Sequence, residues 1–243
     1  MKTYFNVQGD YYENAHYAGT KSQEFMYVSR ENFLIDFMEL SGNETILDVG
    51  CGSGVFSRLL AKKYPYSKII GIDISEEAVD FATKAKEKEG LKNVSFIVAG
   101  INKLPFKNDL FNIIIVSHLI EHLEKPNEAL KEVNMRLKKG GVLFITTPNY
   151  LSLWPLAEII FDVFYAKKGY NLGEQHIFKF NYYSLKKAVL TNNFTVNNIK
   201  TLYLLSLQFA IISKKIGWLF FGLDKFLSFI PFGMIIYLKA VKN

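Results

Sequence analysis

Residues 45–54 read TILDVGCGSG, and this segment decides the fold. Its first half is a short apolar run, Ile46 to Val49, typical of a buried β-strand. Glycine recurs at positions 50, 52 and 54, where it allows a sharp turn and lets a flat ligand approach the backbone. A helical pattern starts at Val55, so the N-terminus of that helix is expected to point toward the same ligand.

A second strand, Ile69 to Asp73, follows and places one carboxylate at its carboxyl end. Asp73 comes 19 residues after Gly54, close to the spacing of about 20 residues at which an acidic side chain holds the hydroxyl groups of a ribose. Together the two segments predict a site for an adenosine-containing cofactor.

Two features distinguish a methyl donor from a dinucleotide. The dinucleotide pattern G-x-G-x-x-G requires glycine at position 55, where this chain has Val55, and the other register ends on Ser57. Asp48 precedes the first glycine by two residues. Its carboxylate would repel a pyrophosphate but suits a ligand with an ammonium and a sulfonium group. Both features argue against an NAD-dependent oxidoreductase.

Further motifs follow in order: LPF at 104–106, FNIIIVSHLIEHL at 111–123 and LKKGGVLFITTPN at 137–149. With the two segments above, they resemble class I S-adenosylmethionine (SAM)-dependent methyltransferases, especially the type 11 and ubiquinone-pathway O-methyltransferases. The resemblance covers residues 40–150. It implies an α/β, Rossmann-like three-layer sandwich with a seven-stranded, mostly parallel sheet and an antiparallel last strand. It also implies SAM as cofactor and S-adenosylhomocysteine as product.

The resemblance assigns roles to the glycine loop and to two acids. Asp48 would anchor the amino end of the methionine moiety through water or the loop backbone, and Asp73 would bind the ribose hydroxyls. The residues implied to lie under the cofactor are Gly50, Cys51, Gly52 and Gly54.

Four more residues are assigned to the cofactor in the same way. Ile74 would pack on the adenine, Ile101 and Asn102 would lie at its edge, and Ser117 would lie beside the methionine moiety. Many relatives carry an acid after the third strand, as in G-D-A-E-x-L-P-F, but this chain has Gly100 at that place. The adenine amine would then have only backbone groups and Asn102 as partners, so we expect a lower affinity.

Three histidines and one acid are the candidate catalytic residues. His118, Glu121 and His122 follow the fourth strand, and His176 lies in a later insert. Methyl transfer to oxygen needs an acceptor freed of its proton, either by an imidazole or by a bound divalent metal. The segment is similar to the metal-gathering E-x-x-E-H run of ubiquinone-pathway and small-RNA 2′-O-methyltransferases, with His118 in place of the first Glu. That change would shift the preference from magnesium toward zinc, manganese or iron.

The sequence leaves the metal open, because many methyltransferases of this class keep a histidine here without one. Glu121 and His122 would alternatively bond backbone groups near Asn149. We favour His118 as the general base or as a residue that orients the acceptor.

Composition limits the compartment and the partners. The single cysteine, Cys51, cannot form an internal disulfide, and no signal peptide is visible, so we expect a reducing cytoplasm. The formal charge is +6, and residues 200–243 contain six lysines against Asp224 alone. A basic segment that is also apolar favours an acidic lipid surface over nucleic acid. The alternative is that the lysines only keep an apolar segment soluble.

Strand and helix patterns alternate along the chain. We expect an N-terminal arm and helix at 1–40, a SAM-binding core at 41–148, a substrate-side insert at 149–181 and the rest of the sheet at 182–243, with an apolar lid at 205–232. The expected strands are 45–50, 68–74, 94–99, 111–117, 142–147, 194–203 and 234–241, and the expected helices are 21–40, 55–64, 76–89, 126–139 and 183–192.

These patterns predict a methyltransferase that moves a methyl group from SAM to a small-molecule or lipid-like acceptor, at oxygen. Two alternatives stay open: an NAD-dependent oxidoreductase, and a non-catalytic SAM-fold protein that binds membrane surfaces, which the missing acid at Gly100 would favour. The lid at 205–232 leaves peripheral membrane contact and a homodimer open. Its apolar runs are too short to span a bilayer.

Overall fold

Seven strands form the central sheet, in the order β3-β2-β1-β4-β5-β7-β6. The computed structural model describes residues 21–165 and 176–243, so the expected arm at 1–20 and part of the insert lie outside the described residues. The strands are β1 (Thr45–Val49), β2 (Lys68–Asp73), β3 (Val94–Val98), β4 (Phe111–Ser117), β5 (Leu137–Pro148), β6 (Phe194–Leu202) and β7 (Ile235–Lys242).

The last strand, β7, runs in the direction opposite to the other six strands of the described sheet. Among the described strands, β7 pairs antiparallel with both β5 and β6, whereas β1 pairs parallel with β2 and β4. The predicted sandwich with an antiparallel last strand is therefore confirmed.

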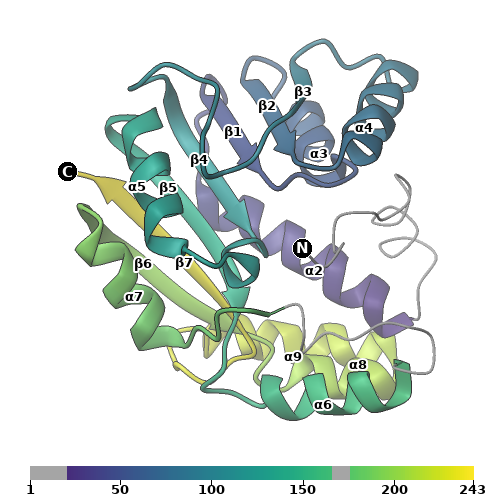
Figure 1. Cartoon of the computed structure of the whole chain (residues 1–243). Helices are drawn as coiled ribbons and strands as arrows, with labels where there is room; N and C mark the ends of the chain where they lie inside the picture. The colour runs from purple at the N-terminus through teal and green to yellow at the C-terminus, as the bar shows by residue number, and fades with distance from the viewer. Residues whose placement is uncertain (1–20, 166–175) are drawn as a thin grey trace.

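Helices cover both faces of the sheet (Figure 1). One apolar core contains the helices α2 (Lys21–Met38) and α3 (Val55–Lys63). The core on the other face contains α5 (Pro126–Arg136) and α7 (Tyr182–Thr191). Because both faces are buried, the central strands are nearly continuous runs of branched apolar residues.

Local signals set several helix boundaries. Ser75 caps α4 (Glu76–Lys88), as its hydroxyl accepts a hydrogen bond from Ala78 N at 3.2 Å. Asn181 begins α7 with a capping box that it completes with Ser184. These caps satisfy amide groups that a helix leaves without partners at its first turn.

The predicted helix at 126–139 is too long by three residues. The helix α5 ends at Arg136, and Leu137 already pairs with Phe111 of β4. Leu137 is fully buried, so this long-range pairing removes it from the helix. Gly140, with φ +71°, then turns the chain within β5 instead of ending the helix.

Three further helices lie beyond the carboxyl ends of the parallel strands, at the lower end of Figure 1. They are α6 (Trp154–Tyr165) in the first insert, and α8 (Ser206–Ile212) and α9 (Lys214–Phe226) in the second. No helix within the described parts of the chain has the length and apolar character needed to cross a membrane.

Candidate active site

The winding of the sheet reverses between β1 and β4. The chain runs outward from β1 to β3 and then returns to β4 on the other side of β1. Open α/β sheets bind ligands at the carboxyl ends of the strands at such a point. The glycine loop at 50–54 follows β1, and His118 follows β4, so the two sequence-predicted groups meet there.

The glycine loop depends on left-handed backbone at three positions. The φ angles of Gly50, Gly52 and Gly54 are +75°, +53° and +73°. The amides of Gly50 and Cys51 both donate to Ile72 O of β2, at 2.8 and 2.9 Å, which folds the loop over the end of that strand. Residues other than glycine are strained in this conformation.

Packing also restricts what could replace two of these glycines. A Cβ atom at Gly54 would lie 2.6 Å from the Phe96 ring and 2.8 Å from Ala82 Cβ. A Cβ atom at Gly50 would lie 3.1 Å from the side chain of Leu119. The lack of a side chain at Gly54 therefore leaves room for Phe96 of β3 and Ala82 of α4 as well as for a ligand. The lack of one at Gly50 lets the segment after β4 approach the loop closely.

The two acids of the loop are fixed by different partners. Asp73 accepts from Gly52 N through Oδ2 and from Ser75 N through Oδ1, both at 2.9 Å. Asp48 is 3% exposed and accepts from Ser57 Oγ at 2.6 Å. Asp73 thus presents a held, partly exposed carboxylate at the end of β2, which suits a ribose diol, and Asp48 braces the start of α3.

The remaining predicted cofactor residues differ in exposure. Ile74 is 45% exposed beside Gly100, Asn102 is exposed, and Ile101 is 6% exposed in the core. Ser117 Oγ lies 2.8 Å from Thr146 Oγ1 of β5. Their contacts with a cofactor stay predictions.

Cys51 has the properties of a packing residue. Burial, together with the carboxylates of Asp48 and Asp73, raises the pKa of its thiol well above the usual value. The thiol is therefore protonated near neutral pH and is a poor nucleophile.

Replacing Asp48 with asparagine is expected to stabilise the ligand-free protein near neutral pH. Burial raises the pKa of Asp48 from 3.8 to about 6, although the hydrogen bond from Ser57 opposes the shift. The folded state thus holds this proton more tightly than the unfolded chain, so stability falls as pH rises through this window. The ionised carboxylate then costs on the order of 3 kcal/mol above pH 6.

Thermal unfolding of wild type and Asp48→Asn between pH 4 and pH 8 measures the effect. The gain in Tm should be small at pH 4 and grow up to about pH 6. A gain that does not change with pH would show that Asp48 carries no such charge cost.

A buried acid and an imidazole form a pair after β4. His118 Nδ1 lies 3.3 Å from Glu121 Oε1, and Thr147 Oγ1 donates to the other carboxylate oxygen at 3.0 Å. Among the described residues, the buried His118 Nε2 has no hydrogen-bond partner. His118 also has φ +50°, a conformation that is uncommon for residues other than glycine and concentrates at functional sites.

The pKa shifts of this pair favour a neutral imidazole and an ionised acid. Burial and the nearby charge of Arg30 lower the pKa of His118 to about 4, against the influence of Glu121. Burial alone would raise the pKa of Glu121, but the hydrogen bond and charge of His118, with the charge of His122, hold that pKa at about 2. His118 is therefore unprotonated at neutral pH and able to accept a proton.

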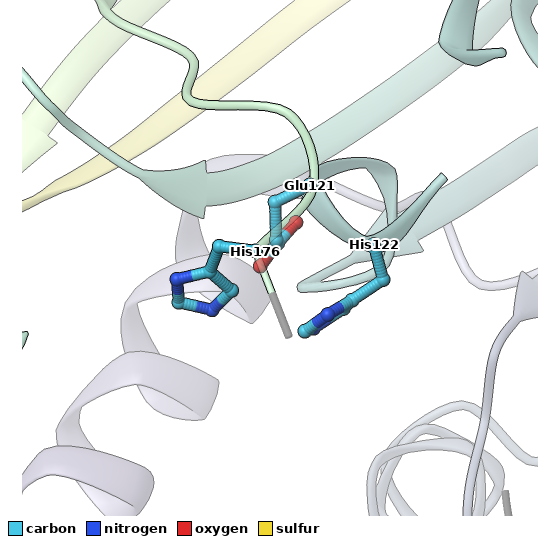
Figure 2. A group of neighbouring side chains, drawn as sticks. All are labelled: Glu121, His122 and His176. Carbon is cyan, nitrogen blue, oxygen red and sulfur yellow. The ribbon is translucent and has the colours of Figure 1, made fainter. Parts of the chain in front are cut away.

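His176 comes from the first insert and faces the same acid. Figure 2 shows the Glu121 carboxylate between the rings of His122 and His176, and the three side chains each offer one ligand atom within 4.8 Å of the others. The two ring centroids are 5.1 Å apart. The structure therefore brings all four predicted catalytic residues together.

Two residues that the sequence analysis missed hold His176. The ring Nδ1 lies 2.9 Å from Tyr150 Oη and 3.2 Å from Glu158 Oε1, and Tyr150 also donates to Glu158 at 2.8 Å. Tyr150 Oη donates its proton to Glu158, so Nδ1 of His176 acts as a donor to these oxygens and the Nε2 lone pair faces the site. The signal was present in the sequence, because Glu158 interrupts the otherwise apolar residues 156–160.

Comparison with known proteins identifies the family. A family model described as "Methyltransferase domain" matches residues 40–202. The chain belongs to the methyltransferase domain family. The predicted resemblance to class I SAM-dependent methyltransferases is confirmed at this level.

Two curated relatives of this methyltransferase domain have related names. The ubiquinone biosynthesis O-methyltransferase of Coxiella burnetii is 34% identical over 123 residues, which cover 49% of this chain and 51% of that protein. The mitochondrial ubiquinone biosynthesis O-methyltransferase of Candida albicans is 34% identical over 107 residues, which cover 43% of this chain and 32% of that protein. The chain spans about half the length of these relatives or less.

Solved structures of low sequence identity share the fold. A SAM-dependent methyltransferase from Mesorhizobium loti has a TM-score of 0.66 at 17% identity and covers 90% of this chain and 100% of its own. The [4+2]-cyclase SpnF has a TM-score of 0.65 at 19% identity, with 90% and 82% coverage. The same methyltransferase fold is thus shared with a protein named for a cyclisation, so the reaction must be argued from the site.

Proposed function

We propose that the protein transfers the methyl group of SAM to an oxygen atom of a small-molecule or lipid-like acceptor. The observation that carries the proposal is the contact between His118 and the buried Glu121, at the switch point beside the glycine loop. The two relatives named as ubiquinone biosynthesis O-methyltransferases support oxygen as the accepting atom.

The residues of the loop suit a SAM-like ligand. The Asp73 carboxylate is held at the end of β2, and no side chain in the described part of the chain caps the start of α3. A ligand with a diol and a carboxylate would find an acceptor and helix amides at these two places. When bound, SAM supplies an electrophilic methyl group.

His118 then acts as the base. Its Nε2 accepts the hydroxyl proton of the acceptor, and Glu121 stabilises the imidazolium that forms, by the contact at Nδ1. The Nδ1 contact also orients the ring, so the lone pair of Nε2 keeps one direction. Burial of Glu121 strengthens the electrostatic interaction, because the carboxylate is kept from water.

Glu121, His122 and His176 would hold a divalent metal on the other side of the same acid. Their ligand atoms are close, His176 is fixed by Glu158, and a donor set rich in nitrogen suits zinc, manganese or iron better than magnesium. A metal there would lower the pKa of an acceptor hydroxyl. The fit rests on the ligand atoms of the three residues, which all lie within 4.8 Å of one another.

The proposal places the protein in the cytoplasm, because Cys51 as a single cysteine favours a reducing compartment. The acceptor is a small molecule or a lipid rather than nucleic acid, since the basic charge gathers in an apolar segment.

Binding of cofactors separates the proposal from an oxidoreductase. We expect S-adenosylhomocysteine to bind in isothermal titration calorimetry and to raise Tm, and we expect NAD at the same concentration to do neither. The reason is Val55, which replaces the third dinucleotide glycine, and Asp48, which opposes a pyrophosphate. Binding of NAD with no binding of S-adenosylhomocysteine would overturn the proposal.

A further inference from the structure

The helix α6 turns an apolar stripe toward solvent. Leu156, Ile159, Ile160 and Val163 repeat at the spacing of one helix face, and they are 48–66% exposed. This spacing normally marks the side that packs on a core. Glu158 lies on the buried side instead, where it contacts His176. Trp154 is also buried, so α6 packs on the core with one side and leaves this apolar stripe exposed on the other.

The α8–α9 hairpin also leaves large apolar side chains exposed. Leu219 and Phe226, seven residues apart on α9, are both 75% exposed, and Ile212 at the end of α8 is also 75% exposed. The opposite side of α9 is buried, where a Cβ atom at Gly217 would lie 2.6 Å from Ala210 Cβ of α8. Large apolar side chains that gather exposed on packed helices are typical of interaction sites.

The exposed charges of the hairpin are positive. Asp224 is the single acid between residues 203 and 233, and it is 1% exposed. Its carboxylate accepts from Ser206 N at 2.9 Å and so caps α8. Lys215 and Lys225 are exposed, and Lys214 pairs with Glu24 of α2.

We propose that α6 and the α8–α9 hairpin dock on the surface of an anionic lipid bilayer. We call the docking surface, made by the side chains of Leu156, Ile159, Val163, Ile212, Leu219 and Phe226, the apolar end. Apolar side chains that enter the headgroup region, beside lysines that attract anionic lipids, are the chemistry of interfacial helices. All three helices lie at the carboxyl end of the strands (Figure 1), so docking turns the candidate site toward the bilayer.

A second copy of the chain fits this surface less well. A twofold interface places the same patch on both partners, so the exposed Lys215 and Lys225 of each copy would meet their own kind. The buried Asp224 offers them no partner. An anionic bilayer would contact both the apolar side chains of the apolar end and the lysines beside them. Docking of this kind does not depend on methyl transfer.

Vesicle flotation tests the proposal. The full chain is expected to float with vesicles of phosphatidylglycerol and phosphatidylcholine, and roughly tenfold less with phosphatidylcholine alone. The Leu219→Ser/Phe226→Ser variant should lose at least about tenfold in partition into the mixed vesicles. Leu190→Ser, which removes an exposed leucine side chain (48%) on α7, is the control and should float like wild type.

Two further measurements keep the result interpretable. Phe226→Trp should retain binding and show a blue shift of tryptophan fluorescence on adding mixed vesicles, and circular dichroism checks that the serine variant is folded. Equal flotation of wild type and a folded serine variant would overturn the proposal. So would a dimer in light scattering that the serine substitutions dissociate, with no flotation of wild type. Binding of S-adenosylhomocysteine, measured in the same samples, should be unchanged in every variant.

Discussion

Replacing Asp73 with alanine is expected to weaken S-adenosylhomocysteine binding by about a hundredfold. The carboxylate is the candidate acceptor for the ribose hydroxyls, and a hydrogen bond to a charged group contributes roughly 1.5–3 kcal/mol. The same carboxylate holds Gly52 N and Ser75 N, so the loop also loses two contacts. Isothermal titration calorimetry with S-adenosylhomocysteine gives the dissociation constant directly.

Asp73→Asn is the matched control for this prediction. Its side-chain oxygen still accepts from one of the two amides, so the loop is disturbed less, but the charge is gone. We expect an affinity between those of wild type and Asp73→Ala. A folded Asp73→Ala protein with wild-type affinity would remove Asp73 from the cofactor site.

Replacing His118 with alanine is expected to lower kcat by roughly 10²–10⁴-fold and to leave S-adenosylhomocysteine affinity unchanged. Nε2 is the candidate proton acceptor, and the contact of Nδ1 with Glu121 at 3.3 Å orients the ring. Alanine is also strained at φ +50°. Asparagine tolerates this backbone and carries no base, so His118→Asn should be as inactive as the alanine variant and close to wild type in Tm.

The pH dependence of wild-type activity is a second test of His118 as the general base. A general base must be unprotonated. Activity is therefore expected to fall as the pH drops through the His118 pKa of about 4, and His118 should cause no further change above about pH 5. An exposed imidazole would instead give a limb near pH 6.5. Full activity of His118→Asn would exclude the imidazole as the base and leave the metal set around Glu121.

Local sequence signals were enough for the sheet and the loop. The strand β1 is a short apolar run closed by glycines, and Asp73 ends the next such run, so their roles in the fold follow from neighbouring residues. The helix boundary at Arg136 did not follow, because Leu137 is removed from the helix by its pairing with Phe111, 26 residues earlier.

Contacts between distant residues limited the prediction of the site. The sequence named His118, Glu121, His122 and His176 as a group, and the structure brings them together. It did not show that Tyr150 and Glu158 fix His176, because that contact depends on how α6 packs. The apolar residues of α6 also recur in the sequence at helical spacing, but this spacing alone does not show whether that face of the helix packs on the core or faces solvent.

The position of β7 has a consequence for how the chain is assembled during translation. This strand sits between β5 and β6, although both precede it on the chain. Until β7 emerges from the ribosome, the two strands that it will join each expose a row of unpaired amides and carbonyls, a state prone to aggregation. Completion of the sheet is therefore a late event, and a chaperone that shields nascent strands would benefit this protein more than one whose strands pair in order of synthesis.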